Sequence, residues 1–374
     1  MQQAVIAGYV RTPFHFARKG ALAEVRPDDL AGLVVKELVA RTGVDPATLE
    51  DVVFGCAYPE AEQGNNIARI AVLLAGLPID VAGMTVNRFC GSSMSAIHIA
   101  AGQIAIGAGE AFIAGGVESM TRVPQGGFNF SPNPNLMEAY IAMGQTAENV
   151  AAQYGVSRAE QEELAFASQQ KAAAAQAAGR LKDEIVGVMT PAGLVDVDGC
   201  LRPQTTLEGL AGLKPAFRPD GSVTAGTSSP LTDGAAATLV TSEDYAARNG
   251  LEVLARIRAV AAAGCPPEIM GMGPVPATRK ALARAGLTID DIDVVEINEA
   301  FGSQAVACVR ELNIPWEKVN IDGGGIAIGH PLGATGARIT AKAAQIMKRE
   351  GKRFALSTQC IGGGQGVATI LEAA

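Results

Sequence analysis

Apolar residues follow two alternating spacings along the first third of the chain, and this alternation predicts an α/β fold. Short apolar or β-branched runs such as residues 51–55 are typical of buried strands, whereas residues 28–42 repeat apolar positions every three or four residues, as an amphipathic helix does. Strands that alternate with helices favour a sheet covered by helices. The expected strands are 4–9, 51–55, 83–89 and 111–117, and the expected helices are 28–42, 66–76 and 92–106.

The pattern changes after the first third of the chain. Residues 120–140 contain three prolines and two glycines, which indicates an irregular excursion. A long amphipathic helix is expected at 157–180, where Ser157 and Glu160 have the spacing of a capping box. Strand signals stay few beyond it. We therefore interpret residues 120–230 as an inserted domain and not as a continuation of the sheet.

The later chain repeats the pattern of the earlier chain. Residues 41–55 and 284–298 each contain a helix end with a glycine, an acidic turn and a β-branched strand. After each comes a helix, a short strand with Val-Asn, a glycine-bearing loop, a helix and a strand. A period this long is not that of a solenoid. The predicted organisation is an N-terminal half at 1–119 completed by about 231–253, the inserted domain at 120–230, and a C-terminal half at 254–374.

Composition narrows the classes of protein. Hydrophobic residues make up 48% of the 374 residues and charged residues 18%, which fits a core-rich protein that hides surface in a homo-oligomer. A net charge of −8 without a basic block argues against nucleic acid or an anionic membrane as a partner. We expect no signal peptide and no membrane span. The helix at 92–106 is apolar on almost every side, so we expect it to be deeply buried.

The six cysteines are scattered and form no CxxC pair. This spacing suggests neither a disulfide framework nor a zinc site, so no metal is expected. Reduced thiols in a cytoplasmic protein are the simplest interpretation.

Cys90 is the first candidate for chemistry. It lies in "NRFCGSSMSA", between an expected strand and an expected helix. If Cys90 begins the helix, free backbone N–H groups and the helix dipole favour its thiolate. The alternative is a small buried residue, which many free cysteines are. This stretch alone leaves both interpretations open.

His330 is the histidine best placed to act on a substrate. The chain has three histidines. His98 lies in the apolar helix and is expected to be packed or hydrogen-bonded in the core, and His15 in an early loop is expected at the surface or at an interface. His330 follows a glycine-rich run and precedes Pro331, where a strand-to-helix loop would open into a cleft. The glycine spacing does not match a phosphate-binding loop.

Two further stretches carry candidate residues. Cys360 ends an expected strand and is followed by glycines that can aim backbone N–H groups into a cavity, although a tight hairpin is the alternative. Asn298 follows another strand, where it could instead cap the next helix. Two thiols and a histidine that meet at the junction of two halves would suit acyl transfer. The sequence has no GxSxG elbow and no HExxH motif.

Six motifs together are similar to those of the thiolase family, in the family's order and over nearly the whole chain. They are "VNRFCGSSMSA", "GGVESM", "AGTSSPLTDGAAA", "INEAF", "GGGIAIGHPLGATGAR" and "CIGGGQG". The resemblance implies a thiolase-like α/β fold, with two similar five-layered α-β-α-β-α halves and an inserted loop domain that holds CoA. It implies thiolysis of 3-ketoacyl-CoA by CoA, or the reverse Claisen condensation, without a metal or redox cofactor.

The resemblance also implies a role for each catalytic candidate. Cys90 would be the nucleophile that carries the acyl group, and His330 would activate it. Cys360 would be the general acid and base. Asn298 would hold a water that forms one oxyanion hole with His330, and the N–H groups of Cys90 and Gly362 would form a second.

Substrate-binding residues follow from their positions in the same motifs. Plain packing or a solvated face is the alternative for each of them. The resemblance implies that Arg202 lies against the adenine, that Phe217, Ala225 and Ser229 line the pantetheine path, and that Met143, Met270 and Phe301 wall the acyl end.

Two departures bear on the substrate. Short-chain biosynthetic thiolases usually have His-Met where this chain has Ala142-Met143, and "CGSSM" resembles degradative thiolases more than the "CASG" of many acetoacetyl-CoA enzymes. Both favour a 3-ketoacyl-CoA thiolase of broader chain length. The alternatives are a biosynthetic acetoacetyl-CoA thiolase, a non-catalytic thiolase-like protein that binds CoA or lipid, and a ketosynthase-type enzyme. The expected assembly is a dimer or a dimer of dimers, and a hydratase–dehydrogenase partner is also considered.

Overall fold

The computed structural model describes residues 2–123 and 125–374. Within them, the strands of the first half lie in the order β1-β8-β5-β3-β4, with the short β2 on β8. Strands β3, β4 and β5 are parallel, whereas β8 runs antiparallel to β1 and β5. The bounds are β1 Ala4–Arg11, β2 His15–Phe16, β3 Asp51–Gly55, β4 Ala82–Val86, β5 Ala111–Ser119 and β8 Thr232–Ser242.

The strands of the second half continue the same sheet in the order β10-β11-β12-β9. The β10–β11 pair is parallel, and the other two pairs are antiparallel. A short antiparallel pairing of β1 with β9 joins the two halves into one ten-stranded sheet of the described residues. The bounds are β9 Ala255–Gly264, β10 Val294–Ile297, β11 Phe354–Ile361 and β12 Gln365–Glu372.

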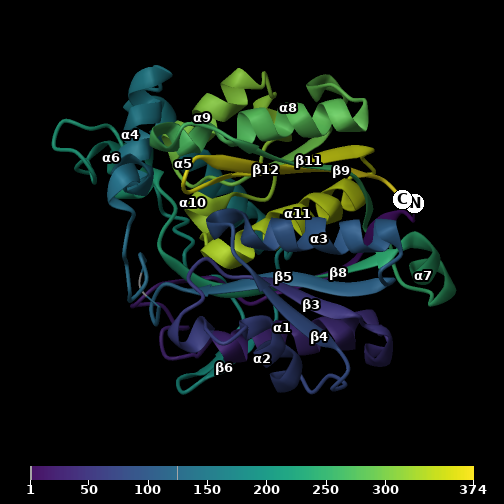
Figure 1. Cartoon of the computed structure of the whole chain (residues 1–374). Coiled ribbons are helices and arrows are strands. Elements are labelled where there is room, and N and C mark those ends of the chain that lie inside the picture. The colour runs from purple at the N-terminus through teal and green to yellow at the C-terminus, as the bar shows by residue number, and fades with distance from the viewer. Residues whose placement is uncertain (1, 124) are drawn as a thin grey trace.

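Helices form the outer layers and the middle layer between the two sets of strands (Figure 1). Helices α1 (Pro27–Thr42) and α2 (Ile67–Leu74) cover the first set on its outer face, and α8 (Pro274–Ala285) and α9 (Gly302–Glu311) lie outside the second set. Helices α3 (Ser92–Ile106) and α11 (Leu332–Arg349) lie side by side in the middle. The resulting order of helix, strand, helix, strand and helix confirms the predicted thiolase-like α/β class.

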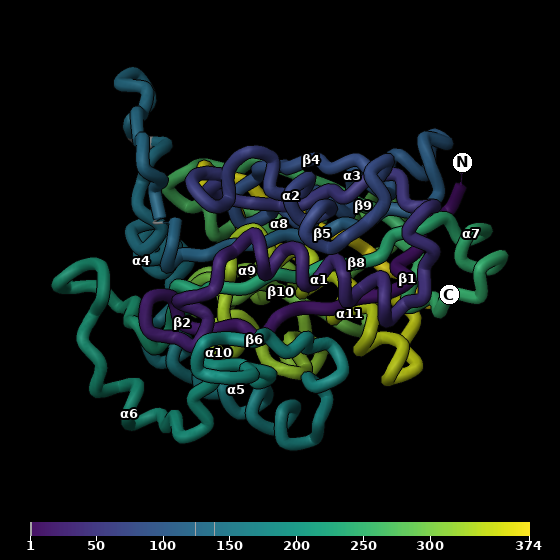
Figure 2. The backbone as a smooth tube through the Cα atoms, turned by 90° about the horizontal axis from the view of Figure 1, so that it is seen from below, coloured from purple at the N-terminus to yellow at the C-terminus, as the bar shows by residue number. Residues whose placement is uncertain are grey.

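The remaining elements lie at the edges of these layers. The segment that leads into α4 extends away from the rest of the molecule, as does the loop around α6 (Figure 2). The helices are α4 Met143–Gln153, α5 Arg158–Ala177, α6 Leu207–Ala211, α7 Glu243–Arg248 and α10 Gly325–Ile328, and β6 Val188–Thr190 pairs with β7 Gly193–Val195. The 3-10 turns are Pro46–Thr48, Ala61–Gln63, Phe89–Gly91, Pro134–Tyr140, Ala225–Thr227, Pro267–Met272, Ile289–Asp291 and Trp316–Lys318.

The expected elements are present, with two changes: the short Val-Asn strand expected in the second half is only an isolated bridge between Val319 and Val295, and the strand before Cys90 is shorter. The strand expected at 83–89 ends at Val86, and a 3-10 turn at Phe89–Gly91 leads into α3. The capping box of Ser157 and Glu160 begins α5 as predicted. The division of the chain at 1–119, 120–230 and 254–374 stays a prediction.

Two burial predictions are wrong. Helix α3 is not buried on every side: Ile106 is 79% exposed, and no atom of the described residues lies within 4 Å of a Cβ added at Gly102, one turn earlier. The stretch Phe89–Ile106 is, among the described residues, the one helical segment long and apolar enough to cross a membrane, and 50% of it is buried inside the molecule. His15 lies in β2, not in an exposed loop, and its Nε2 is 3.0 Å from the Val197 carbonyl oxygen.

Candidate active site

The turn that carries Cys90 is held from strand β11. The Gln359 side chain donates a hydrogen bond to the Cys90 carbonyl oxygen. Gly91 packs so closely on Ile361 that a Cβ at Gly91 would lie 2.4 Å from the Ile361 Cδ1. Phe89 adopts a positive φ of 42°, which is uncommon for a bulky residue. A strained turn fixed by two β11 side chains therefore sets the position of Cys90.

The surroundings of the Cys90 sulfur act on its ionisation in two directions. Burial raises the pKa of the Cys90 thiol to about 11, while hydrogen bonds from the backbone N–H groups of Gly362 and of Cys90 itself favour the thiolate. The start of α3 is therefore not enough to make Cys90 a thiolate. Cys90 needs a base to remove its proton.

His330 lies between α10 and α11 in a fixed hydrogen-bonded geometry. Its backbone N–H donates to the Thr232 Oγ1 at 3.0 Å. The Thr335 hydroxyl lies 2.6 Å from the Nδ1 of His330 and donates its own proton to the Pro331 carbonyl oxygen at 2.9 Å. Because that hydroxyl proton is already used, Nδ1 carries the ring proton and donates it to Thr335. The Nε2 of His330 is thereby left as an acceptor.

The charge state of His330 matches this role. Burial and, to a smaller extent, the positive charge of Arg338 together lower the pKa of His330 to about 4. His330 is therefore neutral near pH 7, with an unprotonated Nε2 that can accept a proton.

Cys360 lies at the end of β11 among apolar side chains. It is 1% exposed and packs in one cluster with Met270 and Ala300, against which Met143 and Phe301 also lie. Burial raises the pKa of the Cys360 thiol well above its ordinary value, and the next largest contribution comes from Cys90. The residues on either side of Cys360, Gln359 and Ile361, contact the turn of Cys90, so the two cysteines lie on neighbouring elements across the junction of the two halves.

Asn298 faces His330 from the end of β10. Its Nδ2 lies 3.3 Å from the Nε2 of His330, while its Oδ1 is buried without a hydrogen-bond partner in the described part of the chain. The alternative of a helix cap is wrong, because Phe301 occupies the N-cap of α9. Buried polar atoms are normally satisfied, so the free Oδ1 indicates a place for a water or a substrate atom.

Three residues that support this site were not predicted from the sequence. Thr335 orients the His330 ring, Gln359 holds the Cys90 carbonyl, and Glu118 accepts hydrogen bonds from the N–H groups of Ala57, Tyr58 and Gly333. Glu118 thereby fixes the start of α11 to the first half. Glu118 lies in the "GGVESM" motif and is buried. The signal available in the sequence was a carboxylate at the end of an apolar strand.

The residues expected along the substrate path are only partly brought together. The Phe217 and Phe301 rings meet edge to face at 5.9 Å, and both the N–H and the Oγ of Ser229 lie 3.0 Å from the Ala300 carbonyl oxygen. These contacts continue the apolar cluster around Cys360. Arg202 lies apart from this cluster, with its guanidinium 5.8 Å from the Phe16 ring, and Ala225 is exposed on a 3-10 turn.

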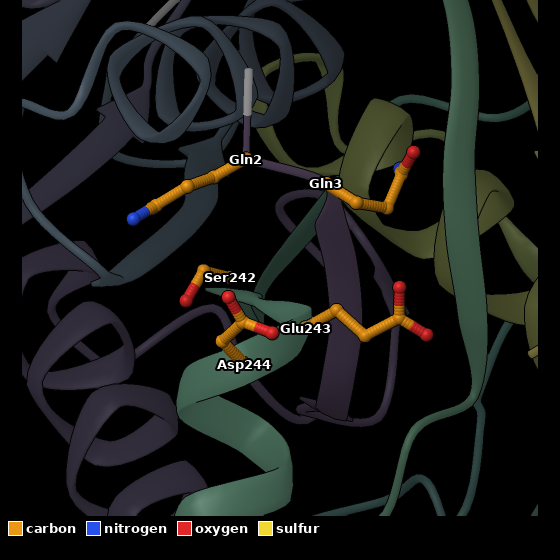
Figure 3. Close-up of a pocket in the computed structure, with 5 residues that line it drawn as sticks. All are labelled: Gln2, Gln3, Ser242, Glu243 and Asp244. Carbon is orange, nitrogen blue, oxygen red and sulfur yellow. The ribbon is translucent and has the colours of Figure 1, made fainter.

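Two hollows of the described structure lie away from these residues. One, of about 320 Å³, is lined by Gln2 and Gln3 and by the start of α7 (Figure 3). The other, of about 460 Å³, lies between α5, α9 and Trp316. Neither is lined by a cysteine or a histidine, so neither competes with Cys90 and His330 as a site of acyl transfer.

Comparison with known proteins agrees with this geometry. Residues 4–244 match the family model "Thiolase, N-terminal domain" and residues 251–373 match "Thiolase, C-terminal domain". The chain is 48% identical to a 3-ketoacyl-CoA thiolase of Bacillus subtilis (strain 168), with 100% of both chains covered. It is 47% identical to a 3-ketoacyl-CoA thiolase of Pseudoalteromonas translucida (strain TAC 125), over 100% of this chain and 99% of the relative. A 3-ketoacyl-CoA thiolase of Shewanella loihica is 48% identical over the full length of both.

Proposed function

Because the chain belongs to the thiolase family, we propose that it is an acetyl-CoA C-acyltransferase of the degradative type. It cleaves 3-ketoacyl-CoA with free CoA and yields acetyl-CoA and a shortened acyl-CoA. The observation that carries this proposal is the contact of the Cys90 turn with strand β11 on both sides of Cys360: Gln359 donates a hydrogen bond to the Cys90 carbonyl oxygen, and Gly91 packs on Ile361. It brings a nucleophile of the first half against the strand that carries Cys360 in the second half.

The first half-reaction forms an acyl thioester on Cys90. Nε2 of His330 accepts the thiol proton as the sulfur attacks the ketone carbon, and the N–H groups of Cys90 and Gly362 bind the resulting oxyanion. The bond between the α-carbon and the ketone carbon then breaks, and its electron pair stays on the departing acetyl-CoA. Cys360 donates the proton that neutralises this carbanion, while His330 and a water on Asn298 stabilise the enolate oxygen.

The second half-reaction returns every proton. The Cys360 thiolate accepts the thiol proton of CoA, and the CoA sulfur attacks the acyl group on Cys90. Collapse of this intermediate releases acyl-CoA, and the Cys90 sulfur recovers its proton from His330. The proposed chemistry uses side chains, backbone N–H groups and the two substrates, without a further cofactor.

The acyl and pantetheine groups follow the contacts described above. We propose that Met143, Met270 and Phe301 wall the acyl chain, and that Phe217 and Ser229 line the pantetheine path toward Cys360. Ala225 on its exposed turn and Arg202, toward the adenine, would contact the outer part of CoA.

Substrate length separates this proposal from the biosynthetic alternative. Thiolysis rates are measured with four-carbon and eight-carbon 3-ketoacyl-CoA in the presence of CoA. A degradative enzyme cleaves both, and cleavage of the four-carbon substrate alone would favour an acetoacetyl-CoA thiolase. Mass spectrometry of protein mixed with 3-ketoacyl-CoA should find an acyl group on Cys90. Absence of both turnover and adduct would contradict the proposal and favour a non-catalytic CoA-binding protein.

We further propose that the chain forms a homo-oligomer, either a dimer or a dimer of dimers. Strand β4 is an edge strand, and apolar residues near it and near α3 are exposed, which supports burial against a second copy. Leu73, Leu74, Ile79 and Ile106 are the most exposed of these side chains. Sedimentation velocity tests this assembly. The six free cysteines support a cytoplasmic location, where a hydratase–dehydrogenase partner could supply the substrate.

A further inference from the structure

Glu296 is a buried carboxyl without a hydrogen-bond partner. It lies in β10, two residues before Asn298, and is 0% exposed. Both of its carboxylate oxygens lack a hydrogen bond from the described residues. Leaving an ionised carboxylate unsatisfied in this way is energetically unfavourable, and burial accordingly raises the pKa of Glu296 to about 7. The proposed mechanism assigns Glu296 no role.

The nearest cation to Glu296 is Arg338 in α11. The Nη1 of Arg338 lies 3.5 Å from the Oε2 of Glu296, and Arg338 is 1% exposed. Arg338 donates one hydrogen bond, from Nη2 to the Gly323 carbonyl oxygen at 3.1 Å, and its Nε has no partner among the described residues. Glu296 is thus the carboxyl that faces this guanidinium directly, and its ionised form would offset the positive charge.

Arg338 also acts on the proposed base. It lies eight residues after His330, and its charge is the cause, after burial, that lowers the pKa of His330. The field of a buried charge is weakly screened, so an ionised or a protonated Glu296 would change the net field that Arg338 exerts on His330. The charge of Arg338, which lies 3.5 Å from Glu296, therefore links one carboxyl in β10 to the basicity of a ring at the start of α11.

The other charged groups around Glu296 already have partners. Lys342 in α11 binds Glu184 at 2.9 Å and Asp322 at 3.1 Å, and Asp322 in the preceding loop also binds Arg349 at 2.7 Å. Glu299 accepts a hydrogen bond from Ser168 at 2.6 Å. The residue opposite Glu296 in β11 is the uncharged Ser357. Among these groups Glu296 is the one whose carboxyl oxygens are both unsatisfied.

We propose that Glu296 is a positioning residue that exchanges one proton with solvent and thereby sets how strongly Arg338 opposes a positive charge on His330. With Glu296 ionised, the Arg338 charge is offset and His330 accepts the Cys90 proton more readily. With Glu296 protonated, Arg338 acts unopposed and His330 is a weaker base. This inference rests on the proposed function, since it concerns the proton transfer of that same site.

The test compares the pH dependence of thiolysis in the wild type and in Glu296→Gln, which mimics the protonated carboxyl. In the wild type, kcat should rise by about tenfold with an inflection near pH 7, because a general base one pKa unit stronger changes the rate by up to that factor. In Glu296→Gln the inflection should be lost, and kcat should stay at the low-pH value of the wild type. KM for both substrates should be unchanged.

Asp51→Asn is the matched control. Asp51 begins β3 in the other half, and it too has a pKa raised by burial and a buried oxygen without a partner in the described chain. Asp51 is far from β10 in the strand order of the sheet. Removing its carboxyl should therefore leave the pH dependence of kcat as in the wild type. A profile changed equally by Asp51→Asn and Glu296→Gln would show a general effect of buried carboxyls and would overturn the proposal.

Infrared difference spectroscopy measures the protonation of the Glu296 carboxyl directly, without substrate turnover. The carboxylic-acid band that the wild type loses between low and high pH should be weaker in Glu296→Gln by one carboxyl, also in protein that lacks activity. Identical difference spectra, or an unchanged kcat inflection, would overturn the proposal. Should Glu296→Gln not fold, Glu296→Asp replaces it: its shorter side chain lies farther from Arg338, so the inflection should move to higher pH, and an unmoved inflection would contradict the proposal.

Discussion

Helices α3 and α11 occupy corresponding places in the two halves, yet they differ in charge and in burial. Each follows a turn that carries a proposed catalytic residue, Cys90 before α3 and His330 before α11. Helix α3 contains no charged residue and exposes one face, whereas α11 is almost wholly buried and carries Arg338 and Lys342 at 1% exposure. The nucleophile therefore comes from an uncharged helix and the base from a charged one.

This difference explains the resting protonation of the site. No cation lies on α3 to favour a thiolate, so burial dominates and raises the pKa of Cys90 to about 11. On the other side, burial and Arg338 lower the pKa of His330 to about 4. Near pH 7 the site consequently holds a neutral thiol and a neutral imidazole. Charge separation has to accompany the attack on substrate, where the N–H groups of Cys90 and Gly362 stabilise the negative charge.

The largest effect is expected when the nucleophile that precedes the uncharged helix α3 is removed. Cys90→Ala should lower kcat for thiolysis by at least about 10,000-fold, because no acyl thioester can form. CoA binding, measured by calorimetry, should persist. Cys308→Ala is the control, since Cys308 is a buried thiol of the second core that takes no part in the proposed reaction. Equal rates for Cys90→Ala and the wild type would contradict the nucleophile assignment.

The next largest effect is expected from a substitution in the charged helix α11. Lys342→Met removes the ammonium between Glu184 and Asp322 and should lower the free energy of unfolding by up to about 3–5 kcal/mol, because each of these buried carboxylates loses one of its cation partners. Burial opposes ionisation of Asp322, yet Arg349 and Lys342 lower its pKa to about 2. The stability that Asp322 gives is present above its ordinary pKa of 3.8 and is lost toward about 2.

Urea unfolding of Lys342→Met at several pH values measures this effect. The deficit should be full at neutral pH and should shrink as the pH falls from 3.8 toward about 2, where Asp322 of the folded wild type also becomes protonated. A deficit that is independent of pH would indicate lost packing instead of lost charge. No equivalent substitution exists in α3, which has no buried charge to remove.

The sequence predicted the elements around Cys90 and the uncharged helix α3 better than the charged groups around α11. Short apolar strands and Cys90 at a strand-to-helix turn were visible as local patterns, and the strands and helices follow them. Glu296 sits in the apolar strand "VVEI", where no local pattern says which helix packs over it. The exposed face of α3 was misjudged for the same reason: apolar spacing indicates a buried helix but not whether its own chain supplies every neighbour. Both depend on tertiary contacts.

A smaller effect concerns the free energy of unfolding, which the ionisation of buried Glu296 lowers. The folded protein raises the pKa of Glu296 from its ordinary 4.5 to about 7, so it binds the proton more tightly than the unfolded chain does. Stability from this group is therefore fully present below 4.5 and is lost as the pH rises through about 7. Glu296→Gln cannot ionise and should be more stable than the wild type at high pH, by up to about 3 kcal/mol.

Thermal and urea unfolding of Glu296→Gln and the wild type measure this difference. The gap should be close to zero at acidic pH and should widen through neutrality, while the activity of the variant is lower. Such a gain in stability at the expense of rate is the usual trade-off at a functional site. A wild type that is more stable than Glu296→Gln at high pH would mean that the Arg338–Glu296 ion pair stabilises the fold.

The smallest expected effect tests the contact between α3 and α11. A Cβ at Gly336 would lie 2.3 Å from the backbone N of Met94, so Gly336→Ala forces the helices apart and should cost about 1–3 kcal/mol. The Ser93 Oγ, which accepts the Ala337 N–H at 2.9 Å, would lose its partner, and Cys90 would move relative to His330. Activity should therefore fall together with the melting temperature.

Gly102→Ala in α3 is the matched control for this contact. No atom lies within 4 Å of a Cβ added at Gly102, and an alanine there should stabilise the helix by about 0.5–1 kcal/mol. Replacing glycine by alanine should thus lower the free energy of unfolding at Gly336 in α11 and raise it at Gly102 in α3. If Gly336→Ala were as stable and active as Gly102→Ala, the close packing of α3 on α11 could not be what holds the nucleophile at a fixed distance from its base.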